Sequence, residues 1–284
     1  MNKRAAHYIV YLALLTFSFI PLVAGFGFAL AYSFGLTGVL NTGFTFSNWQ
    51  KLFAETNIIA SFFYSAAIAA SSLTIAVFLA IMIALKHQHA FSKGVLSYLI
   101  YIPLAFPGIV AAFFFYQFFT KAGFLSRIFY QLNLIDNIQD FPDLVNDTYG
   151  IGMIVTFVFL AFPFFLLLFI NIIKAERIPE FRQLAATLGA GMRQTLWRVS
   201  VPILLRSALP NIILYFIFIF GTFEIPLLLG RSNPETISVL AIRKLQRFNL
   251  LDLPQGYSVA VIYSLFVFAI LYLLFKNKKI ANDA

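Results

Sequence analysis

Glu224 is the most isolated chemical group in this sequence. It lies in FGTFEIPLLLG and is the only ionisable side chain well inside an apolar stretch. A charge at that depth costs roughly 2.5–3.5 kcal/mol on insertion scales, so it usually faces a cavity or a partner. Such a carboxylate can line or gate a path for a solute, or relay an ion. It can equally be a structural acid bonded to a neighbouring helix or a second subunit, or an acid wetted at the outer interface.

Residue sets for catalysis and metal binding are missing from the sequence. There is no Gly-x-x-x-x-Gly-Lys-Ser/Thr run to hold phosphate and no Gly-x-Ser-x-Gly nucleophile motif. The histidines form no His–acid set with metal-ligand spacing, and there is no cysteine. We therefore expect no enzyme activity, no metal site and no bound cofactor. If ATP drives a process here, a separate polypeptide hydrolyses it.

The second group of candidate residues lies in RQLAATLGAGMRQTLWRVSVP, residues 182–202, which contains arginines but no acid. From Pro179, a residue suited to a first helical turn, the pattern predicts a short helix. Phe181, Leu184, Ala185 and Leu188 recur at helical spacing and form one apolar face. This face is too short and too charged to span a membrane, so it needs another cover.

A bend and a second helix follow. Gly189 stands where a helix C-terminus prefers glycine. A second amphipathic run begins near Met192, with Leu196 and Val199 on the same side. We expect Pro202 to close this run before the chain enters the membrane again.

Two interpretations of this helical segment remain open from its periodicity. In one, it is an interfacial helix on the anionic inner leaflet, held by Arg177, Arg182, Arg193 and Arg198. In the other, it is a docking element that fits a groove on a soluble partner.

The composition explains which elements must position these residues. The chain has 284 residues, of which 61% are hydrophobic and 11% charged, with a mean hydropathy of +0.88. Prolines inside the apolar stretches predict kinks and not helix ends, because neighbours satisfy the freed carbonyls. We predict an all-α polytopic membrane protein, a single transmembrane domain over 1–284, with six transmembrane helices at Tyr8–Phe34, Ile58–Leu85, Val95–Phe119, Ile151–Ile173, Asn211–Leu229 and Tyr257–Phe275.

Basic residues predict the orientation, because Lys and Arg favour cytoplasmic loops. With both termini inside, the inner segments hold 13 basic residues and the outer loops hold 7, with Asp136, Asp140, Asp143 and Asp147 in one outer loop. The fourth connection, about 174–210, is then cytoplasmic. The net charge of +9 follows from this orientation and needs no nucleic acid partner. The acidic loop is expected to be solvated, with a smaller chance that it meets a binding protein.

The 182–202 segment resembles the EAA loop of ATP-binding-cassette (ABC) importer permeases. That pattern is Glu-Ala-Ala, three residues, Gly, nine residues, Ile or Val, two residues and Pro. Gly189, Val199 and Pro202 meet the spacing. Gln183, Leu184 and Ala185 fall on the Glu-Ala-Ala triplet, so only its last alanine is kept. The flanks ERIPEFRQLAATLGA and LPNIILYFIFIF also look like this family.

The resemblance implies that the segment is a coupling helix seated in a cleft of a separate ATPase. Gln183 departs from the pattern, because a glutamine cannot form the ion pair that the family's glutamate can form. Further implied partners are a second permease subunit, identical or not, an extracytoplasmic solute-binding protein and the lipid of a bacterial inner membrane. The expected coupling residues are Phe181, Gln183, Leu184, Ala185, Gly189, Ala190, Arg193, Val199 and Pro202, and Glu224 is the expected pathway residue.

The substrate and two rival functions stay open. The stretches FSNWQKLF and FEIPLLLG look most like permeases for polyamines, ferric iron, thiamine and phosphonates. Glu224 suits a cationic ligand, but one acid does not choose a substrate. A secondary transporter would use Glu224 as an ion or proton relay, and a structural scaffold would transport nothing.

Overall fold

The computed structural model describes the whole chain except residues 1–2, 40, 42, 56, 88–90, 92–93, 248 and 283–284, and it does not describe the side chains of 1–11, 55 and 277–284. Every regular element among the described residues is a helix. By packing, the chain divides into two compact units, residues 1–61 with 237–284 (unit 1) and residues 62–236 (unit 2). This division does not test the prediction of a single permease domain.

Unit 1 joins the two ends of the chain. It contains α1 (Lys3–Ser33), α2 (Ser47–Glu55), the start of α3, α12 (Ile237–Leu245), the 3-10 turn η4 (Leu250–Asp252) and α13 (Leu253–Asn282). Helix α13 packs against α1, α2 and α12. The rings of Tyr32 and Tyr257 stack with centroids 4.4 Å apart, and Phe28 meets Tyr257 edge-on at 5.7 Å. Aromatic pairs of this kind fix the two helices together beyond their buried area.

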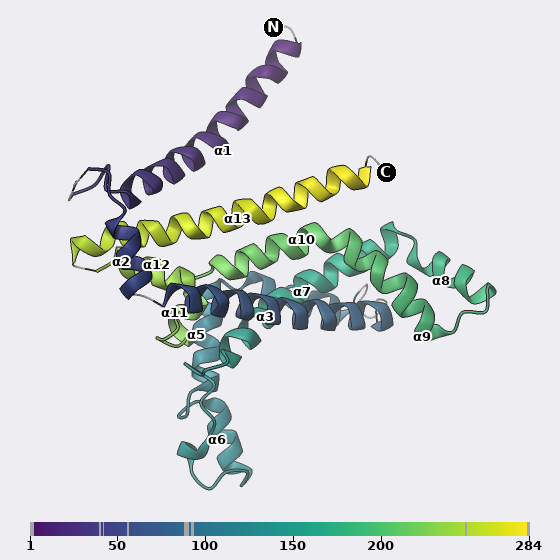
Figure 1. Ribbon diagram of the computed structural model, residues 1–284. Coiled ribbons are helices and arrows are strands. Elements are labelled where there is room, and N and C mark those ends of the chain that lie inside the picture. The colour runs from purple at the N-terminus through teal and green to yellow at the C-terminus, as the bar shows by residue number, and fades with distance from the viewer. Residues whose placement is uncertain are drawn as a thin grey trace. The chain divides into compact units, whose positions relative to one another are not determined.

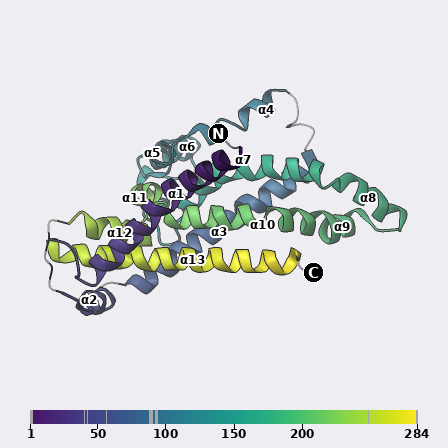
Figure 2. The ribbon, with the colours of Figure 1, turned by 90° about the horizontal axis from the view of Figure 1, so that it is seen from above.

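Unit 2 carries both candidate sites. Most of α3 (Ile58–His87) belongs to it, with α7 (Ile151–Ala175) and α10 (Val201–Gly221) as its other long helices (Figures 1 and 2). Its shorter helices are α4 (Val95–Leu99), η1 (Pro103–Ala105), α5 (Gly108–Phe119), α6 (Phe124–Gln131), η2 (Ile138–Asp140), α8 (Ile178–Thr187), α9 (Met192–Thr195), the π-helical turn η3 (Leu196–Ser200) and α11 (Glu224–Leu229). Phe164 and Phe165 of α7 both contact the ring of Tyr215 on α10, with centroids 5.2 Å apart.

Six helical segments of the described chain are long and apolar enough to cross a membrane, as predicted. Four lie close to the expected positions, at Leu12–Ser33, Ile58–His87, Ile151–Ala175 and Leu250–Lys276. Pro21 and Pro163 lie inside α1 and α7 and, as predicted, end neither helix. The third and fifth spans differ from the prediction.

The third span does not run continuously over Val95–Phe119, and the prediction that Pro103 and Pro107 only kink it is wrong. Phe106 and Pro107 are extended, with ψ of 123° and 145°, and α5 begins at Gly108. A proline disfavours helical backbone in the residue before it, which here is Phe106. The candidate span is Gly108–Gln131.

The fifth span also breaks where a continuous helix was predicted. Helix α10 ends at Gly221, Thr222 is extended with ψ of 131°, and α11 begins at Glu224. At its other end, the candidate span begins at Met192, because α9, η3 and α10 follow one another without interruption. The expectation that Pro202 closes the second run is therefore wrong. Proline is tolerated there because it stands in the first turn of α10, directly after a π-helical turn.

Candidate functional site

The predicted helix, bend and helix between the fourth and fifth spans are present. Arg177 adopts a left-handed conformation (φ 49°) and α8 begins at Ile178, whose side chain is buried. Pro179 stands in the first turn, and Gly189 follows the C-terminus with φ 82°. A positive φ is the conformation that glycine adopts without steric cost. Helix α8 then packs back against α9 and η3, and Figure 1 shows the resulting hairpin beyond the ends of α7 and α10.

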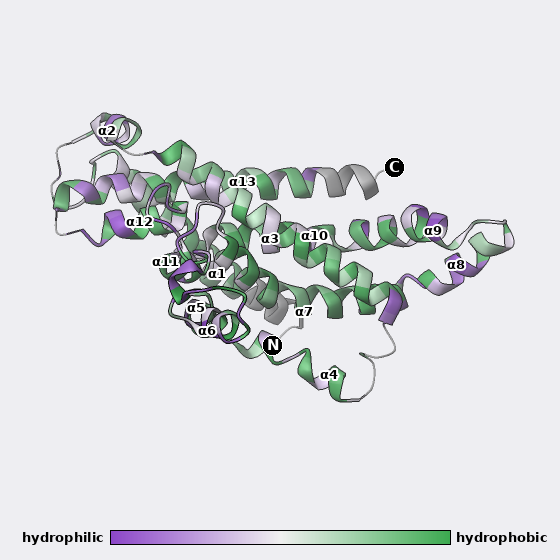
Figure 3. Cartoon of the chain, turned by 90° about the horizontal axis from the view of Figure 1, so that it is seen from below, coloured by the Kyte–Doolittle hydropathy of each residue, from purple (hydrophilic) through white to green (hydrophobic). Residues whose placement is uncertain are grey.

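The apolar face of α8 is uncovered within unit 2. Phe181, Leu184 and Leu188 are 49%, 60% and 82% exposed, and Ala185 is half-buried. Met192 on α9 is 71% exposed. In Figure 3 the hydrophilic residues of α8 and α9 stand beyond the hydrophobic ends of α7 and α10. A hairpin that buries Ile178 but exposes its larger apolar residues is typical of an element that another molecule covers.

The remaining predicted coupling residues lie around the same hairpin. Gln183 and Arg193 are exposed, and Ala190 is half-buried beside the bend. Val199 is half-buried within η3, and Pro202 is exposed at the start of α10. The structure therefore places all nine residues on one helical hairpin and the first turn of α10 that follows it.

The space around Gly189 is open. A Cβ added at Gly189 would meet nothing within 4 Å, so crowding is not what favours glycine at the bend. The restriction at this position comes from its positive φ alone, because left-handed backbone is unfavourable for any residue with a Cβ.

Glu224 lies at the point where two broken spans meet. It is the first residue of α11, half-buried, and a Cβ added at Gly108 would lie 2.7 Å from its Oε2. Gly108 is the first residue of α5, so the carboxylate lies against the first turn of that helix. Free backbone N–H groups and the helix dipole make such a turn favourable for a negative charge. Among the described residues, the structure records no hydrogen bond or ion pair to this carboxylate.

The two short helices α5 and α11 pack together and against α7. Ala111 and Ala112 of α5 are fully buried, which permits the close helix contacts that small residues give in membranes. Ile225 and Leu229 of α11 are also buried. Irregular backbone at membrane depth is tolerated where it is buried in protein or lines a water-filled cavity. Gly108 follows the break in the third span, and Glu224 follows the break in the fifth span. Sequence reasoning did not connect these two positions.

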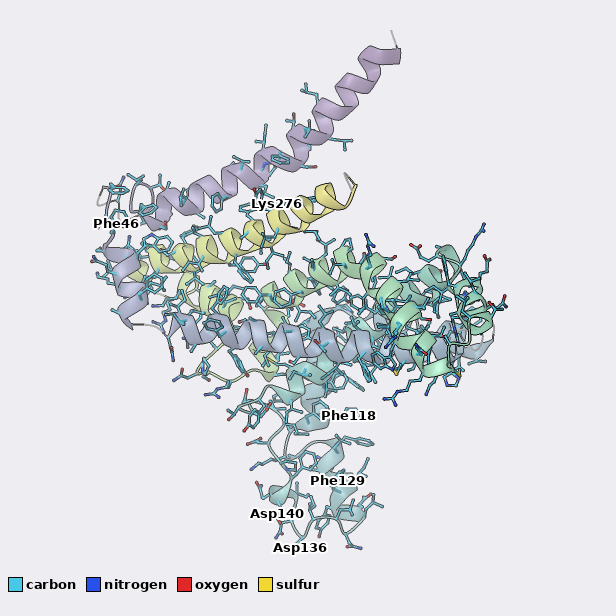
Figure 4. All side chains as sticks on the ribbon, turned by 45° about the vertical axis from the view of Figure 1, so that its right-hand side comes forward. Phe46, Phe118, Phe129, Asp136, Asp140 and Lys276 are labelled. Atoms are coloured by element: carbon cyan, nitrogen blue, oxygen red, sulfur yellow. The ribbon has the colours of Figure 1, made fainter. Side chains whose placement is uncertain are left out.

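Sequence reasoning also missed several polar contacts. Lys244, counted among the seven basic residues of the predicted outer loops, is 3% exposed and donates a hydrogen bond to Gln255. In the acidic loop that is predicted to lie outside, Asp140 takes part in a capping box with Asn137, and Asp147 accepts backbone N–H groups of Tyr149 and Ile151 at 3.0 Å. A capping pattern around an aspartate is the signal that could have shown that part of this loop is structural. Figure 4 shows Asp136 and Asp140 at the far end of the segment that continues from α5.

A comparison with protein families shows which family the chain belongs to. Residues 76–277 match the family described as the inner membrane component of binding-protein-dependent transport systems. The chain belongs to this family. The match includes the α8–α9 hairpin and both broken spans, and it begins after α1 and α2. A member of this family is a transport component of the inner membrane and not an enzyme, as predicted.

Two curated relatives are distant. The maltose/maltodextrin transport permease MalF of Shigella flexneri is 24% identical over 168 residues, which are 58% of this chain but 32% of MalF. The molybdenum transport permease ModB of Azotobacter vinelandii is 25% identical over 189 residues, 66% of this chain and 78% of ModB. The chain thus matches about a third of the first relative's length. Neither relative is named for a polyamine, iron, thiamine or phosphonate.

Solved structures show the same fold. One chain of a bacterial alginate ABC transporter, in complex with an alginate pentasaccharide-bound periplasmic protein, aligns with a TM-score of 0.70 at 14% identity over 96% of this chain and 92% of that chain. A chain of a bacterial ABC transporter that imports the acidic polysaccharide alginate aligns with a TM-score of 0.72 at 15% identity over 98% and 96%. The predicted all-α permease fold is confirmed.

Proposed function

We propose that this chain forms half of the translocation pathway of an ABC importer, with the α8–α9 hairpin docked on a separate ATPase. The observation that carries the proposal is the uncovered apolar face of Phe181, Leu184 and Leu188. This face lies beyond the ends of two membrane helices, on a hairpin shaped by Gly189. A groove in a soluble partner would bury it, as helix-in-groove recognition does. The family's name supports a solute-binding protein as a further partner, and a second permease subunit would complete the pathway.

The test is co-purification of the ATPase together with measurement of solute uptake. Leu184→Asp places a charge on the face to be buried, so we expect loss of ATPase binding while the protein still inserts. Leu134→Asp is the matched control, because Leu134 is 62% exposed in the loop after α6 and Leu184 is 60% exposed. A membrane-surface helix predicts the opposite outcome, in which Leu184→Asp weakens lipid contact and the ATPase stays bound. That result would contradict the docking proposal.

For the pathway we propose that Glu224 faces the translocated solute. Its support is the position of the carboxylate at two helix breaks, which in membrane transporters are typical of substrate sites near the midplane. The substrate we propose is a small solute of the polyamine, iron, thiamine or phosphonate kind, and the chain binds no cofactor of its own. The negative charge favours a cation within that group. The test compares the uptake of labelled polyamine with the uptake of labelled phosphonate, in cells that express the whole transporter. The comparison separates a cationic substrate from an anionic one.

A secondary transporter is the alternative, because a carboxylate that lies between broken helices and has no recorded partner among the described residues would also serve as an ion relay. Uptake by the purified chain in vesicles with an ion gradient and no ATPase would favour this alternative. Uptake that requires both the ATPase and ATP would favour the importer.

A further inference from the structure

A hollow lies beside the apolar face of α8, where α7 ends. Helix α7 ends at Ala175, and the left-handed Arg177 turns the chain directly into α8. The turn leaves a hollow of about 470 Å³ on the surface of unit 2. Its lining is formed by Ala175, Glu176, Arg177, Glu180, Phe181 and Leu184.

The hollow carries a negative charge in a basic region. Glu176 and Glu180 are the only acids between Lys174 and Arg206, a stretch that holds six basic residues. Both acids line the hollow, with Arg177 as the single basic residue among its lining residues. The two carboxylates of this basic segment therefore line the same hollow, where they outnumber the one basic side chain.

The two carboxylates are held differently. Glu176 Oε1 accepts a hydrogen bond of 3.0 Å from Ser207 Oγ on α10, which fixes it at the wall of the hollow. Glu180 Oε2 lies 4.0 Å from Arg177 Nη1, and these side chains are 68% and 75% exposed. An ion pair that is both long and exposed is weak, so Glu180 can exchange Arg177 for another cation at little cost.

The rest of the lining is apolar. The ring of Phe181 and the side chain of Leu184 offer surface that water does not satisfy. A side chain that matches both features has a long aliphatic stem and a cationic head, as arginine and lysine have. An arginine adds a planar head that binds a carboxylate in two places and stacks on an aromatic ring. The carboxylates repel the anionic headgroups of the inner leaflet, which disfavours a lipid as the occupant.

We propose that this hollow receives one arginine or lysine side chain of the ATPase subunit, with its cationic head on Glu180. The inference rests on the proposed function and adds a second, reciprocal contact between the permease and the ATPase. The apolar face of α8 enters the ATPase, and a basic residue of the ATPase enters the permease. Both contacts would form on the same helix, so the hollow would fix the rotation of α8 in its groove.

The experiment measures the affinity of the purified permease pair in nanodiscs for its ATPase, as a function of salt. Glu180→Gln keeps the size of the side chain and removes its charge, so we expect affinity to fall about tenfold at low salt and to depend less on salt. Glu180→Arg should weaken binding further. Gln194→Ala is the control, because Gln194 is exposed on α9 of the same hairpin and does not line the hollow.

The partner residue is found by reversal of charge. Arg→Glu and Lys→Glu variants of the ATPase groove are combined with Glu180→Arg, and we expect one of them to restore binding. Unchanged affinity and salt dependence in both Glu180 variants would overturn the proposal, as would a change only in lipid binding. Leu188→Asp separates this failure from failure of the proposed function, because Leu188 lies on α8 outside the hollow. If Leu188→Asp also leaves ATPase binding intact, the docking function itself is wrong.

Discussion

At the scale of single residues, Glu224 is a charge that is costly to place in an apolar segment, and it lies at the favourable end of a helix. Its carboxylate lies against the first turn of α5, so the partial charge of that helix offsets part of the cost of a half-buried acid. This contact explains how the acid is tolerated in an apolar segment. It accounts for Oε2, but it gives no role to Oε1. A purely structural role and a role in the pathway therefore predict different consequences of removing the charge.

We expect Glu224→Gln to reduce solute uptake about tenfold, because a charged hydrogen-bonding group is lost while the shape is kept. Assembly with the ATPase should be unchanged. Asp143→Asn is the control, since this acid is exposed and 4.0 Å from Lys121, in the loop that is predicted to lie outside. Uptake measured at several solute concentrations distinguishes weaker binding from slower transport. Wild-type kinetics in Glu224→Gln would assign this residue to structure.

Gly189 gives a second prediction, with Gly191 as an unusually close control. A Cβ at either glycine meets nothing within 4 Å, but Gly189 has a φ of 82° and Gly191 a φ of −68°. Left-handed backbone costs about 1–2 kcal/mol for a residue with a Cβ. We expect Gly189→Val to insert but to loosen the ATPase or uncouple hydrolysis from uptake, and Gly191→Val to do neither. Equal behaviour of the two variants would show that the bend does not matter.

At the scale of elements, η3 is a π-helical turn within the fifth candidate span, between α9 of the hairpin and α10. A π-helical turn inside a helix corresponds to one extra residue. Ser200 at its end is fully buried, and its Oγ has no hydrogen-bond partner among the described residues. The turn is thus an irregularity within an otherwise continuous helix, placed between α9 and the long helix α10.

We expect deletion of Arg198, an exposed residue of η3, to be tolerated for insertion and thermal stability, because it converts the π-helical turn into an α-helical one. Deletion of Leu205, which is 39% exposed in α10, should abolish assembly, since it rotates one side of the helix by about 100° against the other. Protein yield in the membrane and melting temperature measure both effects. Loss of the protein in both deletions would contradict this interpretation of η3.

The sequence predicts the spans well and the breaks poorly. Hydropathy places six spans because the cost of polar groups in lipid dominates every other preference. A proline has no fixed outcome, since Pro163 remains inside α7 while Pro107 stands outside α5. The neighbours that replace a lost hydrogen bond are tertiary, so the sequence window around the proline does not contain them. The contact of Gly108 with Glu224 is missed for the same reason, because these two residues are more than a hundred positions apart in the sequence.

The hairpin of α8 and α9 was predictable because its signals are local. Pro179, the spacing of Phe181, Leu184 and Leu188, and Gly189 each act within one or two turns of helix. Glu176 and Ser207 are not local partners, and their hydrogen bond depends on how α10 returns beside α7. The hollow beside α8 is therefore visible only in the structure.

At the scale of the whole molecule, the family match and the two packing units divide the chain differently. The match begins at residue 76, within α3, and extends into α13. Helix α1 lies outside it, and its large apolar side chains are mostly exposed, including Leu12, Phe17 and Phe19 at 69%, 83% and 62%. Lipid or another membrane subunit has to cover such a surface.

Orientation in the membrane is the last prediction. It rests on 13 basic residues inside against 7 outside, and the outer loop with Arg231, Arg243, Lys244 and Arg247 weakens that contrast. The structure gives two of these a structural reason, since Lys244 is buried on Gln255 and Arg247 bonds Asp252 at 3.1 Å. Of the inner basic residues, Lys93 lies outside the described residues, as do the side chains of Lys3, Arg4, Lys278 and Lys279.

We therefore expect reporter fusions to place both termini and the α8–α9 hairpin in the cytoplasm, and the loop of Asp136 and Asp140 outside. The ATPase requires this arrangement, because the docking face of α8 has to meet a soluble partner where ATP is present. Fusions to a reporter that is active only outside the cytoplasm test each loop separately. A cytoplasmic signal from the Asp136 loop would reverse the orientation and, with it, remove the α8 hairpin from the reach of any ATPase.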